Sequence, residues 1–278
     1  MATTPGESEP AGDRLVLYLT GETRGNLTPC ACPDAPWGGL GRRVGFLRDA
    51  AQRNPQALVL DAGGFLPVGE VPLRDDPEAG RRLVTLLLNS ISASGIVMTA
   101  VEPGVASFLR RTAPIETARI EESLLITHPP GQIRLRNWNG HKTAIYAVDR
   151  SWADDDLRSI GDRARALSEV TIVLARANAI DGRRVARLTQ ADVVALSRGG
   201  RPKSALLEGR SSMVGAGKLG KEVAEVVLVP DGLHWRVEHY EHHPMDGEGP
   251  LDSGFRAAVK TLLEDYGPGW EVLTTVLD

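Results

Sequence analysis

Apolar runs alternate with amphipathic segments along most of this chain. The short apolar runs have the length and β-branched content of buried strands. They lie at Leu15–Thr20, Ala57–Asp61, Gly95–Thr99, Ser123–Thr127, Val170–Leu174 and Asp192–Leu196. Apolar residues recur at helical spacing in Gly39–Arg53, Pro77–Ser94, Pro103–Thr112, Asp154–Ser168, Gly182–Leu188 and Ser253–Tyr266. Strands that alternate with helices predict an α/β fold in which helices cover the sheets.

Turn residues predict two hairpins. Asn139-Gly140 separates two short strands, and Pro230-Asp231-Gly232 joins two longer ones at Glu222–Val229 and Leu233–His243. The chain has 278 residues, of which 42% are hydrophobic, so it can bury a large core. With no internal repeat or low-complexity linker, residues 14–278 are predicted to form a single domain.

Charge and hydropathy exclude several classes of partner. The chain has 32 basic and 36 acidic residues, a near balance that does not favour binding to nucleic acid. No apolar run approaches the roughly 20 residues that span a bilayer. Residues 1–13 are polar and rich in proline and glycine, and we expect a disordered lead-in without a signal peptide. The expected location is the cytoplasm, or outside it if a leader was removed or a partner carries the chain.

Three motifs near the amino terminus carry a family resemblance. They are GNLTP at 25–29, GGLGRR at 38–43 and LVLDAG at 58–63. Their order resembles the opening of the calcineurin-like metallophosphoesterases, and within them the 5′-nucleotidase and UDP-sugar hydrolase branch. The resemblance implies a four-layer sandwich of two mixed β-sheets flanked by helices. It also implies a binuclear metal site, in which carboxylates and imidazoles hold two cations about 3.5–4 Å apart.

The positions at which the resembled family holds its metals have other residues here. Glu22 stands where that family has an aspartate, and Arg24 stands where it has a histidine. Asp61 is kept, but Gly64 replaces the bridging aspartate. An arginine is always charged and cannot be a metal ligand.

The remaining metal positions are replaced as well. The family has an Asn-His pair after its third strand. The corresponding residues here are Ala100 to Pro103, which include Glu102. Arg176 and Arg198 follow later strands, where the family has histidines. The motifs therefore indicate a non-catalytic pseudoenzyme that serves as a binding or accessory structural subunit of a larger assembly.

The three arginines have two interpretations. Arg24, Arg176 and Arg198 gather at strand ends and bind a phosphate or carboxylate directly. Alternatively, they are solvated or paired with Glu22 and Glu102. The second interpretation is the more ordinary one.

Both cysteines lie in one loop, Cys30-Ala31-Cys32. A stable disulfide is not expected between residues two apart, because good bridges need Cα atoms about 5.5 Å apart. The pair is either two loop thiols or part of a site for a single soft metal, whose other ligands come from elsewhere. No other cofactor is expected.

Four of the six histidines fall within His234–His243. Strand periodicity places His234, Tyr240 and His242 on one face, and Trp235 and Val237 on the other. We interpret the histidine face as the outward side of an edge hairpin, with Trp235 and Val237 inward.

Two further functions stay open beside the pseudoenzyme. One is a divergent metal-dependent phosphoesterase or nucleotidase that uses Glu22, Asp61 and Glu102. The other is a metal or redox protein that uses Cys30 and Cys32. A protein partner is expected to contact three loops, Gly21–Gly38, Phe65–Asp76 and Ala100–Val105. Trp37 lies in the first of them.

Overall fold

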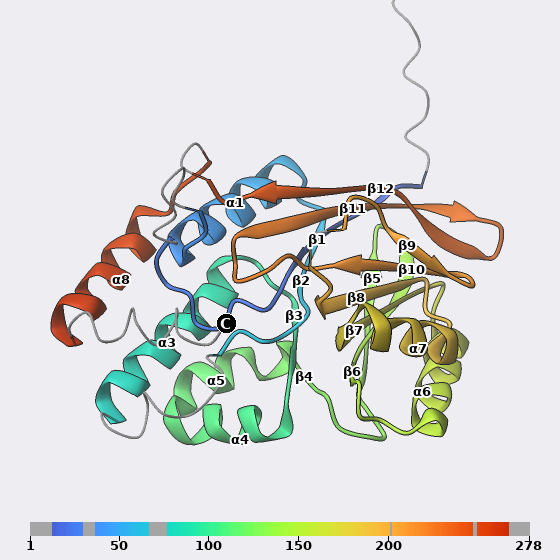
Figure 1. The fold of residues 1–278 in the computed structure, drawn as a ribbon, viewed down its shortest axis with the longest axis horizontal. Coiled ribbons are helices and arrows are strands. Elements are labelled where there is room, and N and C mark those ends of the chain that lie inside the picture. The colour runs from blue at the N-terminus through green and yellow to red at the C-terminus, as the bar shows by residue number, and fades with distance from the viewer. Residues whose placement is uncertain (1–12, 30–36, 67–76, 201, 247–248, 267–278) are drawn as a thin grey trace, which may run out of the picture.

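Two stacked β-sheets form the centre of the molecule (Figure 1). A computed structural model describes residues 13–29, 37–66, 77–200, 202–246 and 249–266. Of the predicted lead-in at 1–13, all but Asp13 lies outside these ranges.

The first sheet has the strand order β12-β11-β1-β2-β3-β4. Its parallel part consists of β1 (Leu15–Thr20), β2 (Leu58–Asp61), β3 (Met98–Val101) and β4 (Leu124–Ile126). The hairpin of β11 (Glu222–Asp231) and β12 (His234–Pro244) extends the sheet, with β11 antiparallel to β1. The sheet is therefore mixed.

The second sheet has the order β5-β6-β7-β8-β10-β9. Four parallel strands form its middle: β6 (His141–Asp149), β7 (Val170–Asn178), β8 (Val193–Arg198) and β10 (Ser211–Gly215). Antiparallel edge strands close it, β5 (Ile133–Trp138) and β9 (Leu206–Glu208). This sheet is mixed too.

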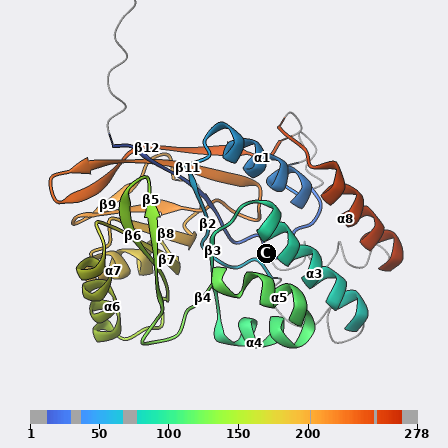
Figure 2. The same ribbon diagram turned by 180° about the vertical axis from the view of Figure 1, so that it is seen from behind.

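Helices cover the outer face of each sheet (Figures 1 and 2). The first sheet carries α1 (Leu40–Arg53), α3 (Pro77–Ala93), α4 (Pro103–Thr112), α5 (Pro114–Ile120), a short 3₁₀ turn (Glu121–Ser123) and α8 (Ser253–Tyr266). The second carries α6 (Asp154–Leu167) and α7 (Ala179–Thr189). The arrangement confirms the predicted four-layer sandwich of two mixed sheets flanked by helices.

Strand β1 shows why its sequence suits the centre of such a sandwich. Leu15, Leu17 and Leu19 are fully buried between the two sheets, whereas Tyr18 faces the helices of the outer layer. A strand covered on both faces needs apolar residues at nearly every position, and LVLYLT provides them.

Several element boundaries differ from the predicted ones. β7 continues to Asn178, whose side chain accepts hydrogen bonds from the backbone N–H groups of Ile180 and Asp181 and so starts α7 three residues before Gly182. The sequence analysis missed α5 and β10. No helix in the described parts of the chain is long and apolar enough to cross a membrane.

Candidate functional site

The carboxyl ends of parallel strands from both sheets lie at one edge of the sandwich. From the first sheet come the segments that follow β1, β2 and β3, and from the second the ends of β6, β7 and β8. Five of the predicted site residues lie there: Glu22, Arg24, Glu102, Arg176 and Arg198. Loops at strand ends are where α/β folds usually place their ligands.

The loop after β1 is bound to the loop after β2. The backbone N–H groups of Glu22 and Arg24 donate to the carbonyl oxygens of Gly63 and Gly64, over 2.7 and 2.8 Å. Glu22 and Arg24 both have φ of 47°, in the left-handed region that non-glycine residues rarely adopt. Strained backbone of this kind concentrates at functional sites, so the loop is a candidate for function.

Glu22 is held by arginines from both sides. Its side chain is only 9% exposed, and its Oε1 accepts a hydrogen bond from Arg24 Nη2 at 2.7 Å. Arg198 Nε, at the end of β8, lies 3.5 Å from the same oxygen. Glu22 therefore links the loop of the first sheet to a strand of the second.

Arg176 makes a second link between the sheets. Its Nη1 pairs with Oε1 of Glu102, which follows β3, and lies 3.2 Å from Oδ2 of Asp149, at the end of β6. The sequence motifs do not identify Asp149, although an acid at the last position of an apolar strand is a usable signal. The ordinary interpretation of the arginines, pairing with Glu22 and Glu102, is what the structure shows.

Asp61 lies apart from these pairs, in the interior. It is 1% exposed and shares the face of β2 with Val59, toward the layer of α1 and α3. Its Oδ1 accepts hydrogen bonds from Gly63 N (2.7 Å) and Thr99 Oγ1 (3.0 Å). Burial raises the pKa of Asp61 to about 6, although the nearby buried guanidinium of Arg43 opposes the rise.

The buried guanidinium of Arg43, on α1, acts electrostatically on this carboxyl. It is 3% exposed, and its Nη2 donates to Ser90 Oγ on α3 at 3.3 Å. Burial lowers the pKa of Arg43, while Asp61 raises it. The hydrogen bonds of Asp61 thus stay within the first sheet and its loop, whereas Arg43 joins α1 to α3.

Solved structures with a similar fold include 5′-nucleotidases and a calcineurin-like phosphoesterase. A 5′-nucleotidase precursor from Thermus thermophilus aligns with a TM-score of 0.67 and 16% identity over 91% of this chain. The sulfate thiohydrolase SoxB of Thermus thermophilus aligns with a TM-score of 0.71 and 13% identity over 94% of this chain. The calcineurin-like phosphoesterase YfkN of Bacillus subtilis aligns with a TM-score of 0.58 and 12% identity over 95% of this chain. The chain has the metallophosphoesterase fold. No protein-family model and no curated protein matches the sequence.

The match covers different shares of these neighbours. The chain spans 59% of the length of the 5′-nucleotidase precursor and 62% of that of SoxB. It spans 99% of the YfkN chain. The metallophosphoesterase fold is thus found over nearly the whole of this chain, as the three sequence motifs predict.

The carboxylates at the strand ends that the structure describes are engaged in ion pairs with arginines. No group of three or more His, Cys, Asp or Glu in the described part of the chain is placed to hold a metal ion. The carboxylates of Glu22 and Glu102 instead face guanidinium groups. Glu22 with its two arginines carries a formal charge of +1, and Arg176 with its two carboxylates carries a formal charge of −1.

The backbone at Gly64 favours glycine. Gly64 has φ of 75°, and a Cβ built there would lie 3.2 Å from Glu22 Cα. A side chain at this position would combine left-handed backbone with a close contact to the backbone of Glu22. The loop as folded is therefore adapted to glycine.

The structure places two of the other predicted site residues outside its described parts. Cys30 and Cys32 belong to the undescribed stretch 30–36, so the predicted soft-metal site stays a prediction. Trp37 is partly exposed, and the next residue, Gly38, donates its N–H to the carbonyl of Met245 at 2.7 Å. Trp37 thus lies beside the end of the β11–β12 hairpin.

The prediction for the histidine strand is wrong from Tyr240 onward. Val227 pairs with His239 and Leu228 with Val237, so Glu238 is an extra residue that forms a β-bulge. Trp235 and Val237 face the core as predicted, but the bulge reverses the alternation and turns Tyr240 and His242 inward. Period-two alternation of side chains does not predict where a strand contains an extra residue that forms a bulge.

The inward turn creates a polar network that the sequence analysis missed. Tyr240 Oη lies 2.6 Å from His242 Nε2, and His242 Nδ1 lies 3.3 Å from Oε2 of Glu222. The Tyr240 hydroxyl also meets the N–H and the carbonyl of Gly215, each at 3.0 Å. Burial raises the pKa of Tyr240 to about 12, so its phenol stays protonated at neutral pH.

Proposed function

We propose that this protein is a pseudoenzyme of the metallophosphoesterase fold, which serves as a binding or accessory structural subunit of a larger assembly. The observation that carries the proposal is the pair of arginine bridges between the sheets. One places Arg176 between Glu102 and Asp149, and the other places Glu22 between Arg24 and Arg198.

The chemistry of the bridges supports a structural role. In a binuclear phosphoesterase, metal cations draw carboxylates from several strand ends together and activate the attacking water. A guanidinium group supplies the cation and the directional hydrogen bonds, but it cannot bind and acidify water as a metal does. The bridges would therefore keep the strand ends together while hydrolysis is lost.

A protein partner is proposed for the surface formed by the same strand ends. The loops expected to contact it are Gly21–Gly38, Phe65–Asp76 and Ala100–Val105, and parts of the first two lie outside the described residues. Within the described parts, Trp37 is partly exposed, and aromatic side chains of this kind are enriched at protein interfaces.

A hydrolysis assay tests the catalytic half of the proposal. The native chain is incubated with bis-p-nitrophenyl phosphate and with AMP, in the presence of Mn²⁺ or Zn²⁺. We expect a rate equal to that of the double variant Glu22→Gln/Glu102→Gln, because neither carboxylate is proposed to hold a catalytic metal.

Metal-dependent hydrolysis that is lost in Glu22→Gln/Glu102→Gln would refute the pseudoenzyme and favour the divergent phosphoesterase. Activity that persists in that variant but is lost in Cys30→Ser/Cys32→Ser would assign the chemistry to the cysteine loop instead. Both results are distinguishable from contamination, since each is tied to named side chains.

A further inference from the structure

A pocket of about 540 Å³ lies between α8, the first turn of α1 and the loop after β1. None of the ion-paired residues of the strand ends lines it. Its wall is formed by the apolar side chains of Leu27, Pro29, Leu251, Val259 and Leu263. Leu27 and Val259 are buried at its base, whereas Leu251 is 45% exposed at the surface.

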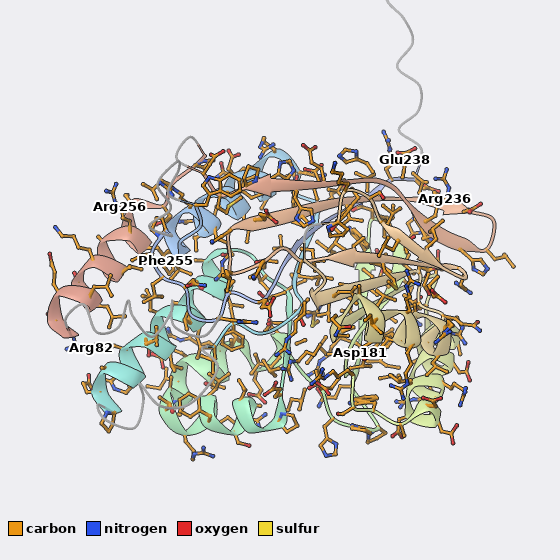
Figure 3. The ribbon with its side chains drawn as sticks, in the orientation of Figure 1. Arg82, Asp181, Arg236, Glu238, Phe255 and Arg256 are labelled. Atoms are coloured by element: carbon orange, nitrogen blue, oxygen red, sulfur yellow. The ribbon has the colours of Figure 1, made fainter. Side chains whose placement is uncertain are left out.

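Cationic side chains share the lining of this pocket. Among the residues that the structure describes, they are Arg42 on α1 and Arg256 and Lys260 on α8, against one acid, Glu264. Lys260 Nζ lies 3.5 Å from Glu264 Oε1, so this acid is already engaged. Arg256 extends from α8 (Figure 3), and its side chain has no ion pair within the described parts of the chain.

The first turn of α1 adds to the positive potential. Gly39 and Gly41 line the pocket, α1 has no side-chain cap at its N-terminus, and its first turn holds no acidic residue. The N–H of Leu40 donates to the carbonyl of Leu27 at 2.9 Å, and the helix directs the partial positive charge of the rest of its first turn toward this side. Apolar walls and cations together fit a ligand with an apolar body and an anionic head.

The size of the pocket suits a small molecule. Sites for small molecules are typically concave, mostly apolar and about 300–1,000 Å³ in volume. The pocket falls within that range.

We propose that this pocket binds a free alkyl carboxylate, a linear amphiphile with one negative charge. The alkyl chain would lie against Val259 and Leu263, and the carboxylate would pair with Arg256, whose planar fork matches its two oxygens. This binding site is separate from the strand-end bridges and does not depend on the proposed function.

Isothermal titration calorimetry of the full chain with decanoate, below its micelle-forming concentration, tests the proposal. We expect saturable binding of one decanoate per chain, and none of decyltrimethylammonium, which has the same tail and the opposite charge. Octanoate should bind more than tenfold more weakly, since each buried methylene contributes about fourfold in affinity.

The variant Arg256→Glu should weaken decanoate binding at least about tenfold, because it reverses the charge that holds the head group. Arg119→Glu, an exposed arginine on α5 away from the pocket, is the matched control and should bind as the native chain does. Both substitutions are at exposed positions, and circular dichroism verifies that both variants fold.

Three results would overturn the proposal. The first is the absence of saturable decanoate binding, as would occur if another part of the chain occupied the pocket. The second is equal affinity for decanoate and decyltrimethylammonium, and the third is unchanged decanoate affinity in Arg256→Glu.

Discussion

Raising the pH from 4 to 7 is expected to lower the free energy of unfolding of the native chain by about 2 kcal/mol relative to Asp61→Asn. The folded-state pKa of Asp61 is raised to about 6 from an ordinary value of 3.8. Between these values the folded chain binds a proton that the unfolded chain has released. Stability from this group is therefore present at low pH and is lost as the pH rises through 6.

Asparagine is a suitable replacement because its carbonyl oxygen still accepts from Gly63 N and Thr99 Oγ1 while the titrating group is removed. Urea unfolding, followed by tryptophan fluorescence at half-unit steps of pH, gives the two curves. Asp162→Asn, an exposed acid on α6, is the control and should not reproduce the difference. Parallel curves for the native chain and Asp61→Asn would show that Asp61 titrates normally and is not desolvated.

His242→Leu is expected to destabilise the fold by about 2–3 kcal/mol. The side chain of His242 is 4% exposed and lies between Tyr240 Oη and the carboxylate of Glu222, itself 9% exposed. Leucine fills the space but leaves a buried carboxylate without its histidine and the Tyr240 hydroxyl without one of its contacts. The measurement is the urea midpoint, with the slope checked for two-state behaviour.

His239→Leu is the matched control, because it makes the same substitution on the same strand at a side chain that is 50% exposed. Its expected effect is within about 0.5 kcal/mol. Equal effects of the two substitutions would mean that the bulge at Glu238 does not turn His242 inward. Tyr240→Phe should reproduce part of the His242→Leu loss, since it removes the hydroxyl that meets both His242 and Gly215.

Much of the architecture follows from the sequence because buried strands and amphipathic helices have distinct periods. LVLYLT and VTIVL predict strands with both faces covered, and both lie in the interior of the sandwich. The missed elements lack this contrast. β10 reads SSMVG, in which buried serines replace apolar residues, and α5 begins with Pro114, only two residues after α4 ends at Thr112.

The sequence predicts which residues lie at the candidate site, but not all of the ion pairs that they form. Motif positions identify Glu22, Arg24, Glu102, Arg176 and Arg198, and strand order places them at one edge. Glu22 and Arg24 share a loop, but the pairing of Arg176 and Arg198 with carboxylates depends on how the two sheets are stacked, and no local pattern encodes that. Asp61 shows the same limit, because its motif suggested a site residue while the face of β2 on which it lies points it toward α1.

Metal content tests most directly whether the arginine bridges stand in place of a binuclear centre. Untagged protein, prepared without chelator, is incubated with Mn²⁺ and Zn²⁺, desalted and subjected to elemental analysis, beside the variants Cys30→Ser/Cys32→Ser and Glu22→Gln/Glu102→Gln. We predict that Cys30→Ser/Cys32→Ser retains no stoichiometric metal, and that any single ion in the native chain is lost with the cysteines. Two metal ions per chain that persist without the cysteines and disappear in Glu22→Gln/Glu102→Gln would contradict the pseudoenzyme.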